Sequence, residues 1–324
     1  MTRIGILGSG AWGTTIAWLL GQNKHTVTIW SRNMTIIDDI NNNHKNSAYL
    51  PNTQLPISVS ASNNLAEVVT NKDLCIFAIP SKSYTILDSL ANSLDQTTPL
   101  LLATKGLTDS QNYVFCSDYA QSIITSDIAV LSGPNLANEI ASTQPAASVV
   151  ASKNNQINQT IQTLLSSSRF RVYSSSDIRG VEFGGIFKNV IAIAAGISDA
   201  LNLGINSKSA LITRGLKEMV TIGTAFGGKK ETFHGLSGLG DLMATCYSSM
   251  SRNWQYGYQK INSSASIEKP NTVEGIRTIE RLYPECKRLG LETPILSEMI
   301  ELLFNNKSPQ KAIESLMSRK LKTE

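Results

Sequence analysis

The feature that most constrains the fold of this chain is a glycine-rich turn directly after its first predicted strand. Residues 2–7 form a short, largely apolar run that is typical of a buried parallel strand. The turn Gly8-Ser9-Gly10-Ala11-Trp12-Gly13 follows at once, and residues 14–20 have the apolar pattern of a helix. Strand, G-x-G-x-x-G and helix in this order are the context of a dinucleotide-binding fingerprint. The start of the chain therefore predicts a βα unit that binds a dinucleotide.

The three glycines of this turn have separate roles in such a unit. Gly8 permits the tight turn, Gly10 lets the backbone approach a pyrophosphate, and Gly13 lets helix and strand pack closely. The helix N-terminus then offers free N–H groups and a positive dipole end to the anion. The alternative is an ordinary glycine-rich turn, and the position of this one between strand and helix argues against it.

The second predicted strand bears on the choice of cofactor. It covers residues 26–30 and ends in Ser31-Arg32-Asn33, without the carboxylate that usually binds the ribose 2′-hydroxyl in NAD-specific sites. Arg32 is suited to meet a 2′-phosphate. We therefore predict NADP or NAD as cofactor, with NADPH accepted. The alternative interpretation of Arg32 is a solvated surface arginine.

The chain length and the order of patterns predict two domains. A chain of 324 residues exceeds the usual size of one domain. Strand-like runs alternate with helical patterns in the first half, and helical patterns dominate beyond about residue 180, where Ser308-Pro309 is typical of an N-cap and first turn. We predict a doubly wound, Rossmann-type parallel α/β domain over residues 1–180 and an all-α domain over residues 181–324. The further predicted strands are residues 74–79, 100–104, 128–132, 147–151 and 170–173.

Composition argues against several classes of protein. The four cysteines are scattered without a C-x-x-C pair, which favours reduced thiols in a cytoplasm, and the three histidines lack metal-ligand spacing, so no metal is expected. The net charge of +4 comes from dispersed basic residues, which suits small anionic ligands better than nucleic acid. No apolar stretch approaches the roughly 20 residues that span a bilayer, so no membrane insertion is expected. The Asn-rich residues 41–46 are predicted to form a surface turn.

A single lysine stands in the most apolar run of the chain. Residues 183–196 contain Lys188 as their one charged side chain. A buried ammonium is costly unless it is paired, and removal from water favours proton exchange near neutral pH. Lys188 is therefore a candidate acid–base residue. The alternative is a lysine whose stem is buried while its ammonium group reaches water.

Together these motifs resemble the bacterial NAD(P)-dependent glycerol-3-phosphate dehydrogenase family. The resemblance implies reversible reduction of dihydroxyacetone phosphate to sn-glycerol 3-phosphate, which supplies the backbone of phospholipids, by a cytoplasmic homodimer. The matching segments occur in family order over nearly the whole chain. They are residues 8–14, 49–51 (Tyr-Leu-Pro), 104–106 (Thr-Lys-Gly), 132–134 (Ser-Gly-Pro), 188–192 (Lys-Asn-Val-Ile-Ala), 235–242 (Gly-Leu-Ser-Gly-Leu-Gly-Asp-Leu), 251–253 (Ser-Arg-Asn) and 273–275 (Val-Glu-Gly).

The resemblance also implies roles for individual residues. Lys188 becomes the proton donor and acceptor, since an ammonium stabilises and protonates the alkoxide that forms when hydride reaches a ketone. Asp241 becomes the carboxylate that holds this ammonium, with a helix N-cap as its alternative. The implied cofactor contacts are Gly8, Gly10, Ala11, Trp12, Gly13, Arg32, Tyr49, Lys105, Ala137, Arg252, Thr272 and Glu274. The implied substrate contacts are Lys105, Gly133, Asn135, Lys188, Asp241, Ser251, Arg252 and Asn253.

Some of these residues have competing structural interpretations. The family commonly has Ser or Thr at the position of Asn135, so this substrate contact is less well supported than the others. Ser251-Arg252-Asn253 also has the form of a helix start with an N-cap serine. Trp12 and Tyr49 are equally suited to core packing.

Two other functions remain open from the sequence. One is a related two-domain reductase, of the β-hydroxyacid dehydrogenase or ketopantoate reductase type, which also has a lysine on the first helix of its helical domain. The other is a redox sensor that binds a dinucleotide without turnover. The segments Gly238-Leu239-Gly240-Asp241 and Ser251-Arg252-Asn253 distinguish the dehydrogenase from these reductases. A sensor has no need for Lys188, Asp241 and Arg252 together.

Overall fold

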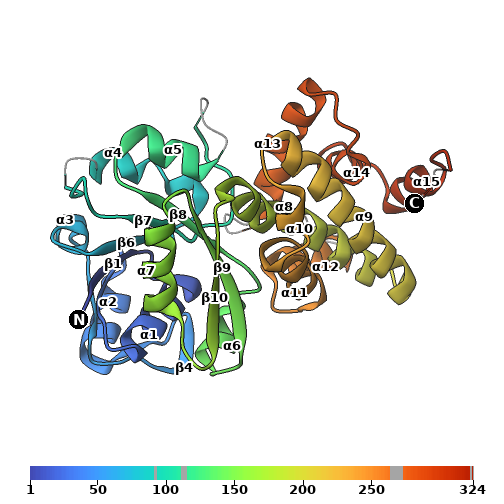
Figure 1. Ribbon diagram of the computed structural model, residues 1–324. Coiled ribbons are helices and arrows are strands. Elements are labelled where there is room, and N and C mark those ends of the chain that lie inside the picture. The colour runs from blue at the N-terminus through green and yellow to red at the C-terminus, as the bar shows by residue number, and fades with distance from the viewer. Residues whose placement is uncertain (91–92, 111–114, 263–272, 322, 324) are drawn as a thin grey trace. The chain divides into compact units, whose positions relative to one another are not determined.

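The protein folds into two compact units, residues Met1–Glu182 and Phe183–Glu324. The computed structural model describes residues 1–324 apart from 91–92, 111–114, 263–272, 322 and 324 (Figure 1). The boundary between the units falls inside one long helix, α8 (Ile178–Ala200).

The first unit is built on an eight-stranded sheet in the order β10-β9-β8-β7-β6-β1-β2-β5. Neighbouring strands are parallel except β8 and β9, which are antiparallel. The order reverses beside β1, and ligands of such sheets bind outside the strand ends at this reversal. The predicted α/β fold class is confirmed. The strands are β1 (Arg3–Leu7), β2 (Thr26–Trp30), β5 (Val59–Ser62), β6 (Leu74–Phe77), β7 (Leu100–Leu102), β8 (Ile128–Ser132), β9 (Ala146–Ser152) and β10 (Phe170–Ser175).

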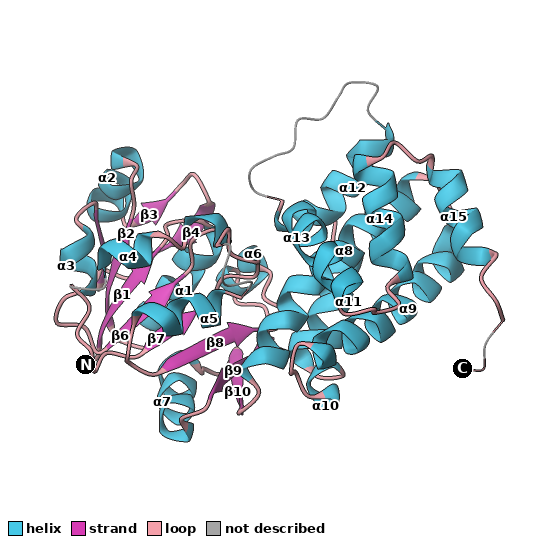
Figure 2. Ribbon diagram, turned by 90° about the horizontal axis from the view of Figure 1, so that it is seen from above, coloured by secondary structure: helices cyan, strands magenta, loops and turns pink. Residues whose placement is uncertain are grey.

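Helices cover both faces of this sheet (Figure 2). Alternate strand residues enter two separate cores: Ile4 and Ile6 of β1 face one, and Leu7 faces the other. A strand buried on both faces reads as a continuous apolar run, which is why the sequence pattern located these strands. The helices are α1 (Ala11–Gln22), α2 (Met34–Asn43), α3 (Leu65–Val69), α4 (Ile86–Leu90), α5 (Cys116–Ile123), α6 (Ala137–Ala141) and α7 (Asn155–Leu165).

The prediction of a surface turn over residues 41–46 is wrong. Residues 41–43 end α2, and Asn46 lies in the short strand β3 (Lys45–Asn46), which pairs with β4 (Leu50–Gln54). Asn46 is only 1% exposed. A polar side chain is buried at low cost when the fold supplies its hydrogen-bond partners, and composition does not reveal those partners.

The second unit is helical, with no strand among its described residues. A five-residue π-helix, Leu236–Gly240, interrupts it at the predicted glycine-rich segment. Ser308 caps the last helix as predicted, because its hydroxyl accepts a hydrogen bond from the Lys311 N–H group at 3.3 Å. After α8 the helices are α9 (Gly204–Ala225), α10 (Lys230–Phe233), α11 (Asp241–Tyr247), α12 (Arg252–Asn262), α13 (Glu274–Arg288), α14 (Pro294–Phe304) and α15 (Pro309–Met317).

Glycines allow other segments to approach α8 closely. A Cβ atom on Gly184 would overlap the carbonyl oxygen of Ser237 in the π-helix. A Cβ on Gly196 would overlap the carbonyl oxygen of Trp254, and one on Gly257 would overlap that of Ile193. Backbone therefore packs on backbone where α8 meets the π-helix and α12, which brings residues of all three segments together around the middle of α8.

The length and hydropathy of α8 are sufficient for a membrane span, which corrects the expectation that no stretch approaches one. Its apolar window is, however, entirely buried inside the folded chain. This is the environment of a core helix.

Candidate active site

The glycine turn has the backbone geometry of an anion-binding loop. Gly8 has φ of +121°, a conformation that favours glycine. A Cβ on Gly13 would overlap the Gly8 carbonyl oxygen, so this position needs glycine for close packing. A Cβ on Gly10 would have no heavy atom within 4 Å. Gly10 therefore faces open space, as a position that admits a ligand should.

The N-terminus of α1 leaves hydrogen-bond donors for a ligand. Gly10 is its N-cap and no side chain caps the helix. The first helical bond runs from the Thr14 N–H group to the Gly10 carbonyl at 2.9 Å, so the N–H groups before Thr14 lack helical acceptors. Free donors, a positive dipole end and space above Gly10 fit the pyrophosphate of a dinucleotide.

A polar hollow of about 520 Å³ lies beside this turn. In it the Ser9 hydroxyl donates to the Ser31 hydroxyl at 2.8 Å. Arg32 is exposed and has no hydrogen bond or ion pair with any described residue, whereas Asn33 caps α2 by accepting from the Thr35 N–H group at 2.9 Å. Arg32 is thus the free cationic group at the hollow. The lining residues are Ser9, Ser31, Arg32, Asn33, Met34, Ile36 and Tyr49.

The two aromatic candidates differ in their surroundings. Tyr49 is 47% exposed and lines the hollow, so core packing does not explain it. Trp12 is half-buried and packs against the apolar core of α1, as its alternative interpretation has it. Its indole Nε1 is buried without a hydrogen-bond partner among the described residues.

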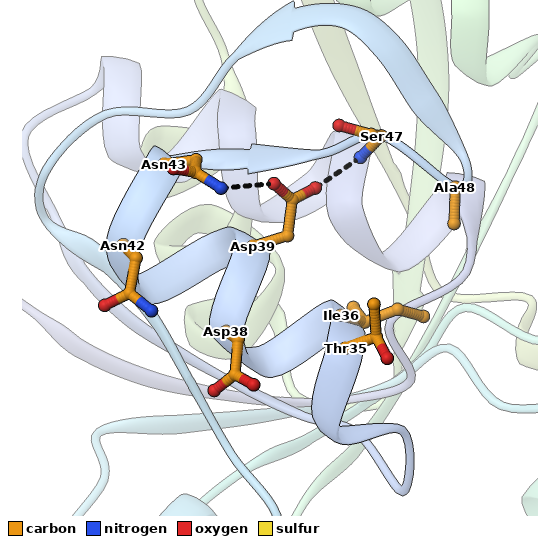
Figure 3. A pocket seen from close by; sticks show the side chains of 8 residues that line it. All are labelled: Thr35, Ile36, Asp38, Asp39, Asn42, Asn43, Ser47 and Ala48. Carbon is orange, nitrogen blue, oxygen red and sulfur yellow. Dashed lines mark hydrogen bonds between the residues drawn. The ribbon is translucent and has the colours of Figure 1, made fainter.

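A second hollow, of about 430 Å³, adjoins α2 (Figure 3). Its central carboxylate, Asp39, accepts from the Asn43 amide at 3.0 Å and from the Ser47 N–H group at 2.8 Å. The Ser47 backbone bond is the main cause that lowers the pKa of Asp39. No predicted site residue lines this hollow, and its carboxylate stabilises the turn that leads to Tyr49.

Three further candidates of the first unit meet at the ends of β7 and β8. The Lys105 Nζ donates to the Gly133 carbonyl at 2.7 Å, and the Asn135 Nδ2 donates to the Ser148 hydroxyl at 3.1 Å. Gly133 has φ of +145°. Ala137 begins α6, and its carbonyl accepts from the Thr15 hydroxyl of α1 at 3.3 Å. The Nδ2 of Asn135 is therefore already engaged, whereas its Oδ1 is buried without a partner among the described residues. Lys105 is held at the strand ends.

Lys188 and Asp241 form a buried ion pair in the helical unit. The Lys188 ammonium donates a hydrogen bond to Asp241 Oδ1, and the two side chains are 10% and 1% exposed. Such burial does not fit a lysine that reaches water. Gly240, not Asp241, is the N-cap of α11, so the capping alternative for Asp241 is wrong. The pairing offsets the cost of burying each charge.

Asn253 joins three helices beside this pair. Its Nδ2 donates to Asn189 Oδ1 at 2.9 Å, and its Oδ1 accepts from the Gly275 N–H group at 2.9 Å. Asn189 follows Lys188 on α8, and Gly275 follows Glu274, the first residue of α13. The structure thus brings Lys188, Asn253 and Glu274 to one region of the helical unit. Thr272, a predicted cofactor contact, lies outside the described residues.

The start of α12 presents the exposed guanidinium group of Arg252. Ser251 is 6% exposed, and its hydroxyl accepts from the Trp254 N–H group at 3.3 Å, as the N-cap interpretation expects. Arg252 is exposed and makes no hydrogen bond or ion pair with any described residue. It is therefore available to an anion.

Sequence reasoning assigned no role to three residues that shape these sites. Asn189 orients Asn253, and the Thr245 hydroxyl donates to the Asp241 carbonyl at 2.6 Å. Asn46 contacts the glycine turn. The spacing of Thr245, four residues after Asp241 on one helix, was a usable signal. Neither the spacing of residues nor the local composition indicates that Asn46 contacts the glycine turn.

Comparisons with known proteins agree with this geometry. The family model described as the N-terminus of NAD-dependent glycerol-3-phosphate dehydrogenase matches residues 3–158, and its C-terminus model matches residues 177–314. A glycerol-3-phosphate dehydrogenase [NAD(P)+] of Syntrophotalea carbinolica is 41% identical, with 99% of each chain covered. The crystal structure of glycerol-3-phosphate dehydrogenase from Coxiella burnetii is 33% identical, with a TM-score of 0.92 over 98% of this chain and 99% of that one.

The related reductases are more distant. A probable 2-dehydropantoate 2-reductase of Bacillus subtilis is 16% identical, with a TM-score of 0.56 over 94% of this chain and 100% of that one, which shows a shared fold alone. The resemblance found in the motifs is confirmed, and the two alternative functions are not supported. The chain belongs to the NAD-dependent glycerol-3-phosphate dehydrogenase family.

Proposed function

We propose that this protein is an NAD(P)-dependent oxidoreductase that reversibly reduces dihydroxyacetone phosphate to sn-glycerol 3-phosphate. The observation that carries the proposal is the buried Lys188–Asp241 pair in a chain of this family. A bound nicotinamide cofactor supplies the hydride that adds to the carbonyl carbon.

Lys188 acts as the general acid in this reaction. As the carbonyl carbon gains a hydride, the C=O π pair moves to the oxygen, and Lys188 Nζ transfers one proton to that oxygen. The neutral amine then regains a proton from water. In the reverse direction the neutral amine removes the hydroxyl proton. Asp241 holds the amine in place and stabilises its charged form.

Arg252 binds the substrate phosphate. Its exposed guanidinium, unpaired among the described residues, suits two parallel hydrogen bonds to phosphate oxygens. Ser251 and Asn253 keep the start of α12 in place, because one caps the helix and the other ties it to α8 and α13. Lys105, Gly133 and Asn135 are assigned to the substrate as well.

Most of the assigned cofactor contacts belong to the first domain, residues 1–180, and the acid Lys188 and the phosphate-binding Arg252 belong to the helical domain, residues 181–324. The turn from Gly8 to Gly13 holds the pyrophosphate, and Tyr49, Lys105 and Ala137 add contacts. Arg32, exposed beside the polar hollow, favours acceptance of NADPH. Arg252 and Glu274, with Thr272, are the cofactor contacts assigned to the helical unit.

The proposed cellular setting is the one that the resemblance to the family implies. We assign the protein to the cytoplasm, as a homodimer that supplies glycerol phosphate for phospholipids, with no membrane insertion. Its four cysteines are buried and free, which fits a reducing compartment. Light scattering of the purified protein tests the dimer.

A spectrophotometric assay tests the activity. Protein, NADPH and dihydroxyacetone phosphate are mixed, and absorbance of the reduced nicotinamide is followed, with NADH and with phosphate-free dihydroxyacetone as comparisons. We expect rapid loss of absorbance with the phosphate ester only. Binding of NADPH without absorbance loss would favour a sensor, and turnover of a β-hydroxyacid or ketopantoate instead would assign the protein to a related reductase.

A further inference from the structure

Asn46 is a buried amide that contacts the glycine turn from outside it. Its Nδ2 donates to the Ser9 carbonyl and to the Thr14 hydroxyl, both at 2.8 Å. The Thr14 hydroxyl in turn donates to the Ser9 carbonyl at 3.3 Å. One side chain therefore ties the turn to the first residues of α1.

The backbone of Asn46 supports a second wall of the same hollow. Its carbonyl accepts from the Tyr49 N–H group at 3.1 Å, and Asn46 pairs with Leu50 between β3 and β4. Ser9 and Tyr49 both line the polar hollow beside the turn. The distance between these two walls thus depends on Asn46.

We propose that Asn46 is a positioning residue for the cofactor, which holds the glycine turn and Tyr49 in their binding arrangement before the cofactor arrives. The inference rests on the proposed function, in which this turn and hollow bind NAD(P)H. A preorganised loop loses little conformational freedom on binding, whereas a loop freed of its restraints loses more, so affinity falls. The Asn46 Oδ1 is buried without a partner among the described residues, so the two donated bonds carry the role.

Asn41 offers a matched control. Its Nδ2 donates to the Ala61 carbonyl at 2.9 Å, and its Oδ1 accepts from the Ala61 N–H group at 2.8 Å. Like Asn46, Asn41 therefore makes two hydrogen bonds through its side-chain amide, but these bonds connect α2 with β5. It lines neither hollow.

The experiment compares Asn46→Ala and Asn41→Ala with the wild type. Kd for NADPH is measured by quenching of tryptophan fluorescence, Tm by thermal unfolding, and kinetic constants by the absorbance assay. Loss of about two hydrogen bonds that hold the loop predicts a Kd roughly tenfold higher in Asn46→Ala, with KM for NADPH rising more than kcat falls. In Asn41→Ala, Tm falls while Kd for NADPH stays within about twofold of the wild type.

Thr14→Val is the second variant, for the case in which Asn46→Ala does not fold. Valine keeps the shape of threonine and removes the hydroxyl that links Asn46 to the turn, so Kd for NADPH rises by roughly threefold or more. Equal Kd values in the Asn46 and Asn41 variants, or an unchanged Kd in Thr14→Val, would overturn the role of Asn46. A wild-type protein that fails to bind NADPH would instead overturn the proposed function.

Discussion

The Lys188 ammonium donates a hydrogen bond to the Asp241 carboxylate across 53 residues of sequence. Both side chains are almost fully buried, and the Thr245 hydroxyl bonds the Asp241 backbone from the next turn of α11. The pair therefore has a fixed geometry, and neither charge is left uncompensated in the apolar interior.

Replacement of Lys188 by methionine should lower kcat by at least about 10²-fold, the low end of general acid–base contributions, while NADPH still binds. Lys208→Met is the matched control. Lys208 is also a buried lysine, 9% exposed at its side chain, and pairs with Asp199 at 2.6 Å. Both variants lose an ion pair made by a buried lysine, but only the first loses the acid. An equal loss of kcat in the two would remove Lys188 from the chemistry. The assay is kcat at saturating NADPH and substrate, with Tm measured for both.

Alanine at Gly10 should weaken cofactor binding, whereas alanine at Gly13 should lower stability. Gly10 faces open space, so Gly10→Ala should keep the wild-type Tm and weaken NADPH binding, because the new methyl group occupies the approach to the turn. Gly13→Ala would place its methyl group on the Gly8 carbonyl and should lower Tm markedly. Thermal unfolding and fluorescence titration check both. Unchanged NADPH affinity in Gly10→Ala would contradict the assignment of this turn.

Arg252→Ala should raise KM for dihydroxyacetone phosphate by roughly tenfold or more, since the charge-assisted hydrogen bonds to the phosphate are lost. The slow rate with phosphate-free dihydroxyacetone, measured at high enzyme concentration, should change little. Lys260→Ala removes a similar exposed charge from the last turn of the same helix and serves as the control. If both substrates suffered equally from Arg252→Ala, the guanidinium would not bind the phosphate.

Arg32→Ala should lower kcat/KM for NADPH by roughly tenfold, because the 2′-phosphate loses its cationic partner. The kcat/KM for NADH should stay unchanged, because NADH has no 2′-phosphate and because Arg32 makes no hydrogen bond or ion pair with a described residue that its loss would break. Initial rates with the two cofactors at fixed substrate provide the ratio. An unchanged ratio would assign Arg32 to the solvated surface.

Glu218 should make stability depend on pH. This carboxylate is 4% exposed and accepts from the N–H groups of Ile295 and Leu296, both at 2.8 Å. Burial raises the pKa of Glu218 to about 7 from an ordinary 4.5, so between these values the folded state binds more protons than the unfolded state. The free energy of unfolding therefore falls as pH rises through this window, by at most about 1.4 kcal/mol per pH unit.

Glu218→Gln lacks this ionisation and serves as the reference. Urea unfolding at constant ionic strength, from about pH 4.5 to pH 7, gives the free energy of unfolding of both proteins as a function of pH. The slopes of the two curves should differ by the contribution of at most one proton. The wild type should lose stability relative to the variant as pH rises. Parallel curves would contradict the raised pKa.

Sequence patterns predicted those elements of the fold that depend on residues close together in the chain. The strand, turn and helix around Gly8 are adjacent in sequence, and their glycines and apolar residues specify them directly. The pairing of Lys188 with Asp241 is different, because no spacing rule joins residues so far apart. The prediction of this pair depended on the resemblance to a family, because the motifs of a family include residues that are brought together only by tertiary packing.

The missed features depend on contacts between distant segments. Asn46 looked like part of a polar turn, because its partners Ser9 and Thr14 are more than thirty positions away, at separations of 37 and 32 residues. The link from Asn253 to Asn189 and Gly275 likewise requires three helices to be in place. The preferences of single residues contain no information about contacts between segments that are far apart in sequence.

The glycines that let α12 lie against α8 also fix the position of Asn253. Any side chain at Gly196 or Gly257 would push a carbonyl group of the facing helix away. Asn253 sits on the helix that would be displaced, and its bond to Asn189 would stretch with it. A larger residue at either glycine should therefore lower the stability of the helical unit and, if Asn253 orders the substrate site as proposed, its activity as well.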